Sequence, residues 1–216
     1  TLIVFDWDDT LLCTGAINKG QWSPQQLQTL ERAVQAVLRI SARLGETMIV
    51  TNGRASWVQE SCRQFLPGLA PMLDDLTVVS ARAEYEHLAP DDPFAWKRHA
   101  FRRIVKQCRG PGSGTSDSPG LNLVVLGDSP VEIEAARRAS KIVGCPCLLK
   151  TVKFQDAPSA SQLIGQVRKV TRELAKIVYD GRNLNRFLSM RDPAPPRTPA
   201  EAAAWKFSCA RLTERL

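Results

Sequence analysis

Two aspartates, Asp6 and Asp8, directly follow the apolar segment 2–5 and are separated by one residue. At the exit of a strand, carboxylates with this spacing can face a common point, so that one can act as a nucleophile and the other as a proton donor. A carboxylate is a weak nucleophile, and its attack on an anionic phosphoryl group needs a cation that aligns the group and screens the repulsion. Aspartates after strands are also common as plain caps, so the pair alone leaves both interpretations open.

Three further groups favour the chemical interpretation. Thr51 and Asn52 follow a second apolar segment and supply a hydroxyl and backbone N–H groups suited to phosphate oxygens. Lys97 begins a basic helical stretch and can bring a positive charge to the same phosphate. Asp128 follows another apolar segment and, together with the first aspartate pair, provides the hard oxygen ligands of a Mg²⁺ site. In this order along the chain, the four groups predict phosphoryl chemistry.

Some positions in these groups have alternatives. Lys97 can instead belong to a solvated basic face of its helix. The role can also fall to one of its basic neighbours, Arg98, Arg102, Arg103 or Lys106. Glu132 is either a water-mediated metal ligand or a first-turn helix acid favoured by the helix dipole. Asp9 is expected to point away from the metal and to cap the turn.

Two kinds of residue near the motifs are not expected to take part in the chemistry. His87 and His99 lack the paired spacing of metal ligands and are expected at or near the surface. Trp7 lies between the two aspartates, points to the opposite side of the strand and is expected to pack under the sheet.

The elements that position these residues are predicted from hydrophobic periodicity. Strands are expected at five segments: 2–5, 47–50, 76–80, 121–126 and 147–154. Helices are expected at five others: 24–44, 55–65, 93–108, 131–140 and 159–179. This alternation predicts an α/β fold, a Rossmann-like three-layer sandwich around a mainly parallel five-stranded sheet. Sites in such sheets lie at the carboxyl ends of the strands, where the polar groups stand.

The sequence predicts one catalytic domain over residues 1–179. A Gly-, Ser- and Pro-rich insertion interrupts it at about 109–120, and a basic, Pro-containing tail follows at 180–216. About 36 residues separate Thr10 from the second strand, and one helix uses most of them. The stretch between Thr51 and Lys97 is used by one helix, one strand and a loop. Neither interval leaves room for a separate cap domain.

The net charge of +7 is concentrated in the C-terminal part, because residues 165–216 carry 11 Lys and Arg against 5 Asp and Glu. An acidic protein, a membrane surface and RNA are all candidate partners for a basic segment. No aromatic stacking pattern accompanies it, which favours a solvated basic surface over nucleic-acid binding. We therefore expect a protein partner for the tail and no nucleic acid. No apolar run reaches the roughly 18 residues of a transmembrane helix.

Six cysteines fit neither a zinc pattern nor the density of a secreted disulfide scaffold. Cys145 and Cys147 alternate with apolar residues, where buried thiols are expected. These features favour the cytoplasm or another reducing intracellular compartment. The chain begins almost at a strand, which indicates trimming, so organelle targeting stays an open alternative.

Over about residues 1–155, the chain resembles the haloacid dehalogenase (HAD) superfamily of phosphatases, whose first motif, DxDx(T/V), is similar to FDWDDTLL. The later motifs of that superfamily resemble IVTNG, FAWKRHAF and VVLGDSPVE. The matching positions are Asp6, Asp8, Thr10, Thr51, Lys97, Gly127 and Asp128. Five segments together resemble most closely a little-characterised group of uncapped HAD-like proteins of eukaryotic microbes. These segments are DWDDTLL, TNGRASWV, SARAEYEHLAPDDPFAWK, GDSPVEIEA and LLKTVKF.

The resemblance implies a role for each matching residue. Asp6 would attack phosphorus and form an aspartyl-phosphate, and Asp8 would protonate the leaving oxygen and then deprotonate the hydrolytic water. The Mg²⁺ ion would be held by the Asp6 carboxylate, the Asp8 backbone carbonyl and Asp128. The phosphate would be bound by Thr51, the Asn52 backbone and Lys97.

The expected function is that of a Mg²⁺-dependent phosphoric monoester hydrolase. By analogy with the family, the absence of a cap favours a macromolecular substrate such as a phosphoprotein. The main alternative is a HAD-like scaffold that acts as a structural or interaction subunit of a larger assembly. A phosphotransferase or phosphomutase that uses the same intermediate is a further alternative.

Overall fold

Six parallel strands form the centre of the protein, described here from a computed structural model over residues 1–107 and 120–188. The strand order is β3-β2-β1-β4-β5-β6, so β1 and β4 are central neighbours. The strand bounds are β1 Leu2–Phe5, β2 Glu46–Thr51, β3 Thr77–Ser80, β4 Leu121–Gly127, β5 Cys147–Lys153 and β6 Leu184–Phe187. The predicted α/β class and parallel sheet are confirmed, with six strands in place of the expected five.

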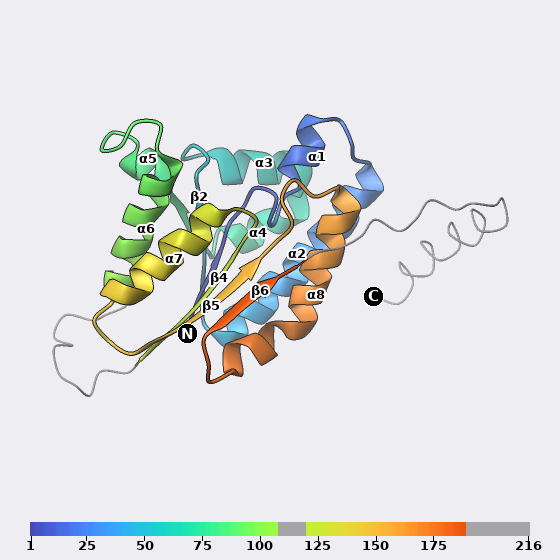
Figure 1. Cartoon of the computed structure of the whole chain (residues 1–216). Helices are drawn as coiled ribbons and strands as arrows, with labels where there is room; N and C mark the ends of the chain where they lie inside the picture. Colours follow the sequence, from blue (N-terminus) through green and yellow to red (C-terminus); the bar gives the residue numbers. More distant parts are fainter. Residues whose placement is uncertain (108–119, 189–216) are drawn as a thin grey trace.

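Helices cover both faces of this sheet (Figure 1). The longer elements are α2 Pro24–Leu44, α3 Trp57–Phe65, α6 Pro93–Gln107, α7 Pro130–Ile142 and α8 Ala160–Tyr179. Short elements not expected from the sequence are α1 Thr14–Asn18, the 3₁₀ turn Pro67–Leu69, α4 Ala70–Leu73 and α5 Ala81–Tyr85. The three-layer sandwich follows from this arrangement.

The two faces of the sheet have separate hydrophobic cores, because side chains alternate along each strand. Ile3 and Phe5 of β1 belong to the core that α2 and α8 cover. Leu2 and Val4 belong to the core that α6 and α7 cover. The register of β1 against β4, Leu2 with Leu123 through Phe5 with Leu126, brings the carboxyl ends of the two strands to the same level.

The sixth strand corrects the predicted domain boundary at residue 179. Leu184–Phe187 pairs in parallel with β5, from Lys150 to Lys153, so the sheet extends into the predicted tail. The rest of that tail, 189–216, and residues 108–119 of the predicted insertion lie outside the described residues. Cys145 and Cys147, expected to be buried, are only partly buried against the α6–α7 core.

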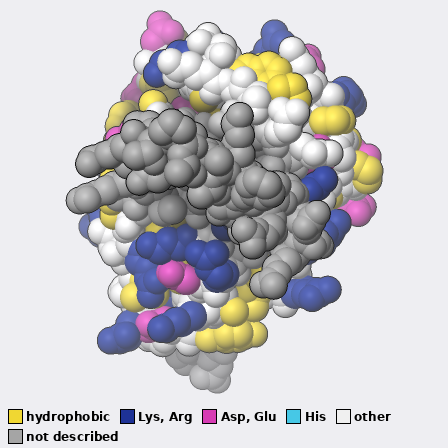
Figure 2. Space-filling view, turned by 90° about the vertical axis from the view of Figure 1, so that its right-hand side faces the viewer, with side chains coloured by type: hydrophobic (Ala, Val, Ile, Leu, Met, Phe, Trp, Pro, Cys, Tyr) yellow, Lys and Arg dark blue, Asp and Glu magenta, His cyan; other side chains and the backbone are white. Residues whose placement is uncertain are grey.

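Residues 10–97 are all described, and they contain no separate cap domain. They form α1, α2, β2, α3, the 3₁₀ turn, α4, β3 and α5, and then enter α6. The face on the side of α1 and α8 carries Lys and Arg side chains next to Asp and Glu (Figure 2). In the described ranges, no helix combines the length and the apolar character that a membrane crossing requires.

Candidate active site

The alternation of side chains in β1 decides which face of the sheet carries Asp6. The strand ends at Phe5, which faces α2 and α8, so Asp6 continues on the face of α6 and α7 and Trp7 on the opposite one. Asp6 is 6% exposed. Trp7 is fully buried, and its indole N–H donates to Ser61 Oγ at 3.0 Å. The prediction that Trp7 packs under the sheet is confirmed.

Lys97 from α6 is the basic residue that meets Asp6. Its Nζ lies 2.7 Å from Asp6 Oδ1 and also forms an ion pair with Glu132 from α7. The lysine side chain is 1% exposed, so this ion pair is shielded from water. Arg98 and Arg102, two of the alternatives for this role, instead line the outer surface of α6.

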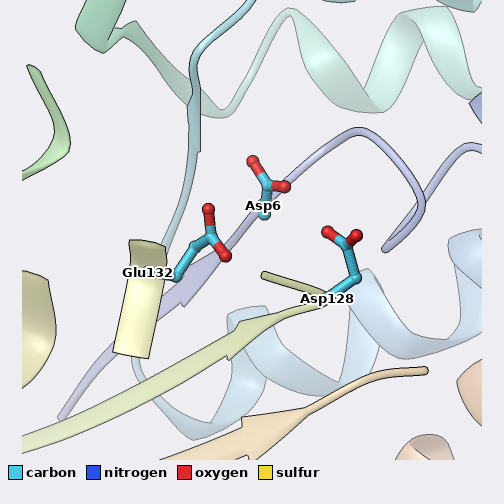
Figure 3. Close-up of side chains that lie close together, drawn as sticks. All are labelled: Asp6, Asp128 and Glu132. Atoms are coloured by element: carbon cyan, nitrogen blue, oxygen red, sulfur yellow. The ribbon is translucent and has the colours of Figure 1, made fainter. Parts of the chain in front are cut away.

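Three carboxylates converge beside this ammonium group. Oxygen atoms of Asp6, Asp128 and Glu132 all lie within 4.8 Å of one another. Figure 3 shows the three side chains extending from the ends of β1 and β4 and from the start of α7 toward a common region. When all three carboxylates are ionised, they and the ammonium group of Lys97 together carry a net charge of −2, which a divalent cation would balance. Hard carboxylate oxygens are the ligands that Mg²⁺ prefers, so the donor set fits this ion.

Glu132 is the first-turn acid of α7, and it also belongs to the acidic cluster. Its Oε2 accepts a hydrogen bond from the backbone N–H of Ser129 at 3.1 Å, in the capping box that begins α7. Its Oε1 is the atom that pairs with Lys97. A side chain at Gly127 would place its Cβ 2.8 Å from Glu132 atoms, so the glycine lets the glutamate lie against the end of β4.

Burial and repulsion from neighbouring carboxylates raise the pKa values of Asp6 and Asp128. Burial raises the pKa of Asp6 well above its usual range, Lys97 acts in the opposite direction, and Glu132 adds to the rise. Burial, with repulsion from Glu132 and Asp9, raises the pKa of Asp128 to about 7. Burial alone would lower the pKa of Lys97, but the carboxylates of Asp6 and Glu132 outweigh it, so that this pKa is raised. The lysine therefore stays protonated at neutral pH.

Asp8 lies apart from the acidic cluster and is held by three donors. Thr14 Oγ1 donates to its Oδ1 at 2.6 Å, and the Trp57 indole N–H lies 2.9 and 3.2 Å from its two oxygens. Thr51 Oγ1 donates to Oδ2 at the longer distance of 3.4 Å. The structure thus separates the two aspartates of the first motif into different surroundings, as a division between nucleophile and proton donor requires.

The remaining predicted residues surround these two aspartates. Thr51 is fully buried at the end of β2, and its hydroxyl accepts a hydrogen bond from the Gly53 N–H at 2.9 Å. Asn52 Nδ2 donates to Pro93 O at 3.2 Å and so ties the loop after β2 to the start of α6. Asp9 has a φ of 50°, and its Oδ1 accepts from the N–H of Gly15 at 2.8 Å, so it caps the turn as expected.

Two residues that contact Asp8 were missed by the sequence reasoning. Trp57 is the first residue of α3, and a side chain at Gly53 would place its Cβ 2.4 Å from the Trp57 ring. The sequence signal was therefore a Gly followed four residues later by a Trp, directly after the predicted phosphate loop. Thr14 begins α1, a five-residue helix whose sequence has no clear periodicity. Nothing in the sequence singled out Thr14.

Neither histidine belongs to the acidic cluster. His87 and His99 are exposed, as expected, and the ring of His99 stacks on Tyr85 at a centroid distance of 5.4 Å. Asp8 and Asp128 are half-buried, whereas Asp6, Lys97 and Glu132 are buried. The solvent-facing side of the site is therefore the side of Asp8 and Asp128.

Comparisons of the chain with protein-family models, with curated proteins and with solved structures give no match.

Proposed function

We propose that the protein is a Mg²⁺-dependent phosphomonoester hydrolase of the HAD type and that Asp6 is its nucleophile. The observation that carries the proposal is the buried group of Asp6, Lys97, Asp128 and Glu132 at the carboxyl ends of β1 and β4. Parallel α/β sheets place their sites at these strand ends. A buried ion pair is weak as a source of stability, because desolvation offsets the attraction. A cluster of this kind at a strand end therefore favours a functional role.

Asp6 and Asp128 would hold the metal ion through their carboxylates, with Glu132 beside them and the backbone carbonyl of Asp8 as a further ligand. When bound, Mg²⁺ would align the phosphoryl group and screen the repulsion between the nucleophile and the phosphate. Lys97 would add its positive charge to the phosphate oxygens, because it already lies 2.7 Å from the attacking carboxylate.

The reaction would proceed in two displacements at phosphorus. An oxygen of Asp6 attacks, the bond between phosphorus and the leaving oxygen breaks, and that oxygen takes a proton from Asp8. Water then attacks the phosphorus of the aspartyl-phosphate and gives a proton to Asp8, which frees Asp6 and inorganic phosphate. Thr51 would redirect its long 3.4 Å hydrogen bond from Asp8 to a phosphate oxygen, next to the backbone of Asn52.

A macromolecular phosphoester, such as a phosphoprotein, is the proposed substrate class. Residues 10–97 contain no cap domain that would enclose a small metabolite. An uncapped site leaves the half-buried side of Asp8 and Asp128 accessible to a side chain that projects from a larger molecule.

Phosphate release from p-nitrophenyl phosphate and from a set of phosphopeptides tests the proposal. We expect turnover with Mg²⁺, none with EDTA, and none in Asp6→Asn. Asp9→Asn is the matched control, since asparagine can also accept the Gly15 hydrogen bond and tolerates a positive φ. It should keep most of the activity. A folded, Mg²⁺-bound protein without turnover on any substrate would overturn the proposal in favour of the scaffold role.

A further inference from the structure

A basic groove lies between the outer surfaces of α6 and α7, the neighbouring helices on the left of Figure 1. Its volume is about 650 Å³. Five of its lining side chains are basic and one is acidic: Arg98, Arg102, Arg137, Arg138, Lys141 and Glu134. The groove is therefore strongly positive, although residues 1–164 as a whole carry almost no net charge.

The positive charge of the groove is only partly neutralised within the protein. Glu134 pairs with Arg138 and lies 3.7 Å from Arg98, which also reaches Asp92 at 3.3 Å. Across residues 1–107 and 120–188, no carboxylate forms an ion pair with three other cations of the groove: Arg102, Arg137 and Lys141. These three side chains are exposed and available to an anionic partner.

A second hollow of about 430 Å³ adjoins the groove. It shares Glu134 and Arg137 with the groove. Its lining also includes Phe94, at the start of α6, and Pro130, at the start of α7 and two residues after Asp128. The two hollows together therefore extend along α7, from Pro130 at its start to Ile142 at its end.

We propose that this groove binds an acidic peptide segment flanking the phosphorylated residue of the substrate, an inference that rests on the proposed function. At a rise of about 1.5 Å per residue, Arg137 and Lys141 lie roughly 8 and 14 Å along α7 from Glu132. An extended peptide spans about 3.4 Å per residue. Acidic side chains about two to five residues from the phosphorylated residue would thus reach the unpaired cations.

The lining of the groove favours a peptide over a single-stranded nucleic acid. Bases bound without sequence preference stack on aromatic side chains, and this groove is lined by no Phe, Tyr or Trp among the described residues. Its one aromatic ring, that of His99, is already stacked on Tyr85. Ala139 and Ile142 supply apolar surface beside the cations. The exposed aromatic ring of Phe94 lines the second hollow, where it can pack against an apolar side chain of the same peptide.

The test compares two triple variants of equal charge change in the full chain. The first is Arg102→Gln/Arg137→Gln/Lys141→Gln, in the groove. The matched control is Arg32→Gln/Arg39→Gln/Arg43→Gln, exposed residues of α2 on the other face of the sheet. KM and kcat are measured on a phosphoserine peptide with Glu at positions +2 to +5 and on the same peptide with Gln there. Binding of the unphosphorylated Glu peptide is followed by fluorescence anisotropy.

We expect the groove variant to raise KM for the Glu peptide about tenfold and to weaken binding of the unphosphorylated peptide similarly, with kcat nearly unchanged. The α2 variant should leave KM and the binding of the unphosphorylated peptide close to the wild-type values. The wild type and both triple variants should hydrolyse p-nitrophenyl phosphate equally. Equal losses in both triple variants would contradict the inference, and so would tighter binding of an oligonucleotide of the same charge than of the Glu peptide. If neither p-nitrophenyl phosphate nor any phosphopeptide is hydrolysed, the proposed function fails, while peptide binding still decides whether the groove recognises acidic segments.

Discussion

The indole N–H of Trp57 lies 2.9 and 3.2 Å from the two carboxylate oxygens of Asp8. The contact joins the first residue of α3 to the loop after β1, so it exists only in the folded chain. It fixes the direction of a carboxylate that the proposed mechanism uses twice, first as an acid and then as a base. Trp57 is therefore a positioning residue for Asp8.

Replacing Trp57 by Phe should lower kcat by about tenfold, because a hydrogen bond to a charged group contributes about 1.5–3 kcal/mol. The ring that packs against Gly53 is retained, so stability should change little. The measurement is kcat on p-nitrophenyl phosphate, compared between the variant and the wild type. Trp96→Phe is the control, since it also removes an indole hydrogen bond, here to Ala89 O at 2.7 Å. Equal effects of the two variants would refute a specific role for Trp57.

Replacing Lys97 by Met should destabilise the protein by about 3–5 kcal/mol, because it leaves the buried carboxylates of Asp6 and Glu132 without their cation. Urea unfolding without metal measures the loss. Arg98→Met, one residue away, removes a surface pair with Asp92 and should cost under about 1 kcal/mol. Mg²⁺ should restore part of the stability of the Lys97 variant, since it can balance the same carboxylates. Similar losses for both variants would show that the ion pair of Lys97 is not the decisive interaction.

The pKa of about 7 predicts how Asp128 affects stability without metal. Because this pKa lies above the ordinary value of 3.8, the folded state holds a proton that the unfolded state has released. The stability associated with this proton is complete below about pH 4 and is lost as the pH rises through 7. Asp128→Asn should therefore stabilise the metal-free protein at pH 8, by about 2–4 kcal/mol, and have little effect at pH 4. Thermal unfolding at both pH values checks this, and a gain independent of pH would contradict it.

The same proton should compete with Mg²⁺. Below pH 7 the affinity for the ion should fall by up to about tenfold per pH unit, and above pH 7 it should level off. Titration calorimetry between pH 5.5 and 8.5 provides the measurement. An affinity that does not vary over this range would show that Asp128 is not a ligand.

The capping boxes that begin α7 and α8, at Ser129 and Ser159, allow a matched test of the role of Glu132, because only the box at Ser129 contains this glutamate. Ser129→Ala and Ser159→Ala should each cost about 1 kcal/mol of stability, because each removes a side chain that accepts a backbone N–H of its own helix. Only Ser129→Ala should also lower Mg²⁺ affinity and kcat, because the capping partner of Ser129 is Glu132. If Ser159→Ala lowers them equally, the effect is one of global stability.

Much of the fold could be predicted from the sequence, since buried parallel strands and amphipathic helices leave strong periodic signals. The sixth strand could not. Leu184–Phe187 is only four residues long, and two of the four, Asn185 and Arg186, are polar. Such a segment becomes a strand because β5 offers it an unpaired edge, which is a property of the assembled sheet.

The basic groove was missed for a different reason. Charge summed along the chain placed nearly all of the positive excess in residues 165–216, because acidic residues elsewhere cancel the cations of α6 and α7 in the sum. In the folded protein these cations gather between two neighbouring helices, and Glu134 is the one acidic residue among those that line the groove.

The sequence by itself determined that Asp6 and Asp128 directly follow apolar strands and that Thr51 lies at the end of another, because those signals are local and periodic. Only the tertiary structure decided that Lys97 is the basic residue that meets Asp6, that Glu132 joins the acidic cluster and that Trp57 holds Asp8. In the sequence, Lys97 is 91 positions from Asp6 and 35 from Glu132. Trp57 is 49 positions from Asp8. The physical reason is that strand order sets which helices cover Asp6, and this order is decided only when the sheet assembles.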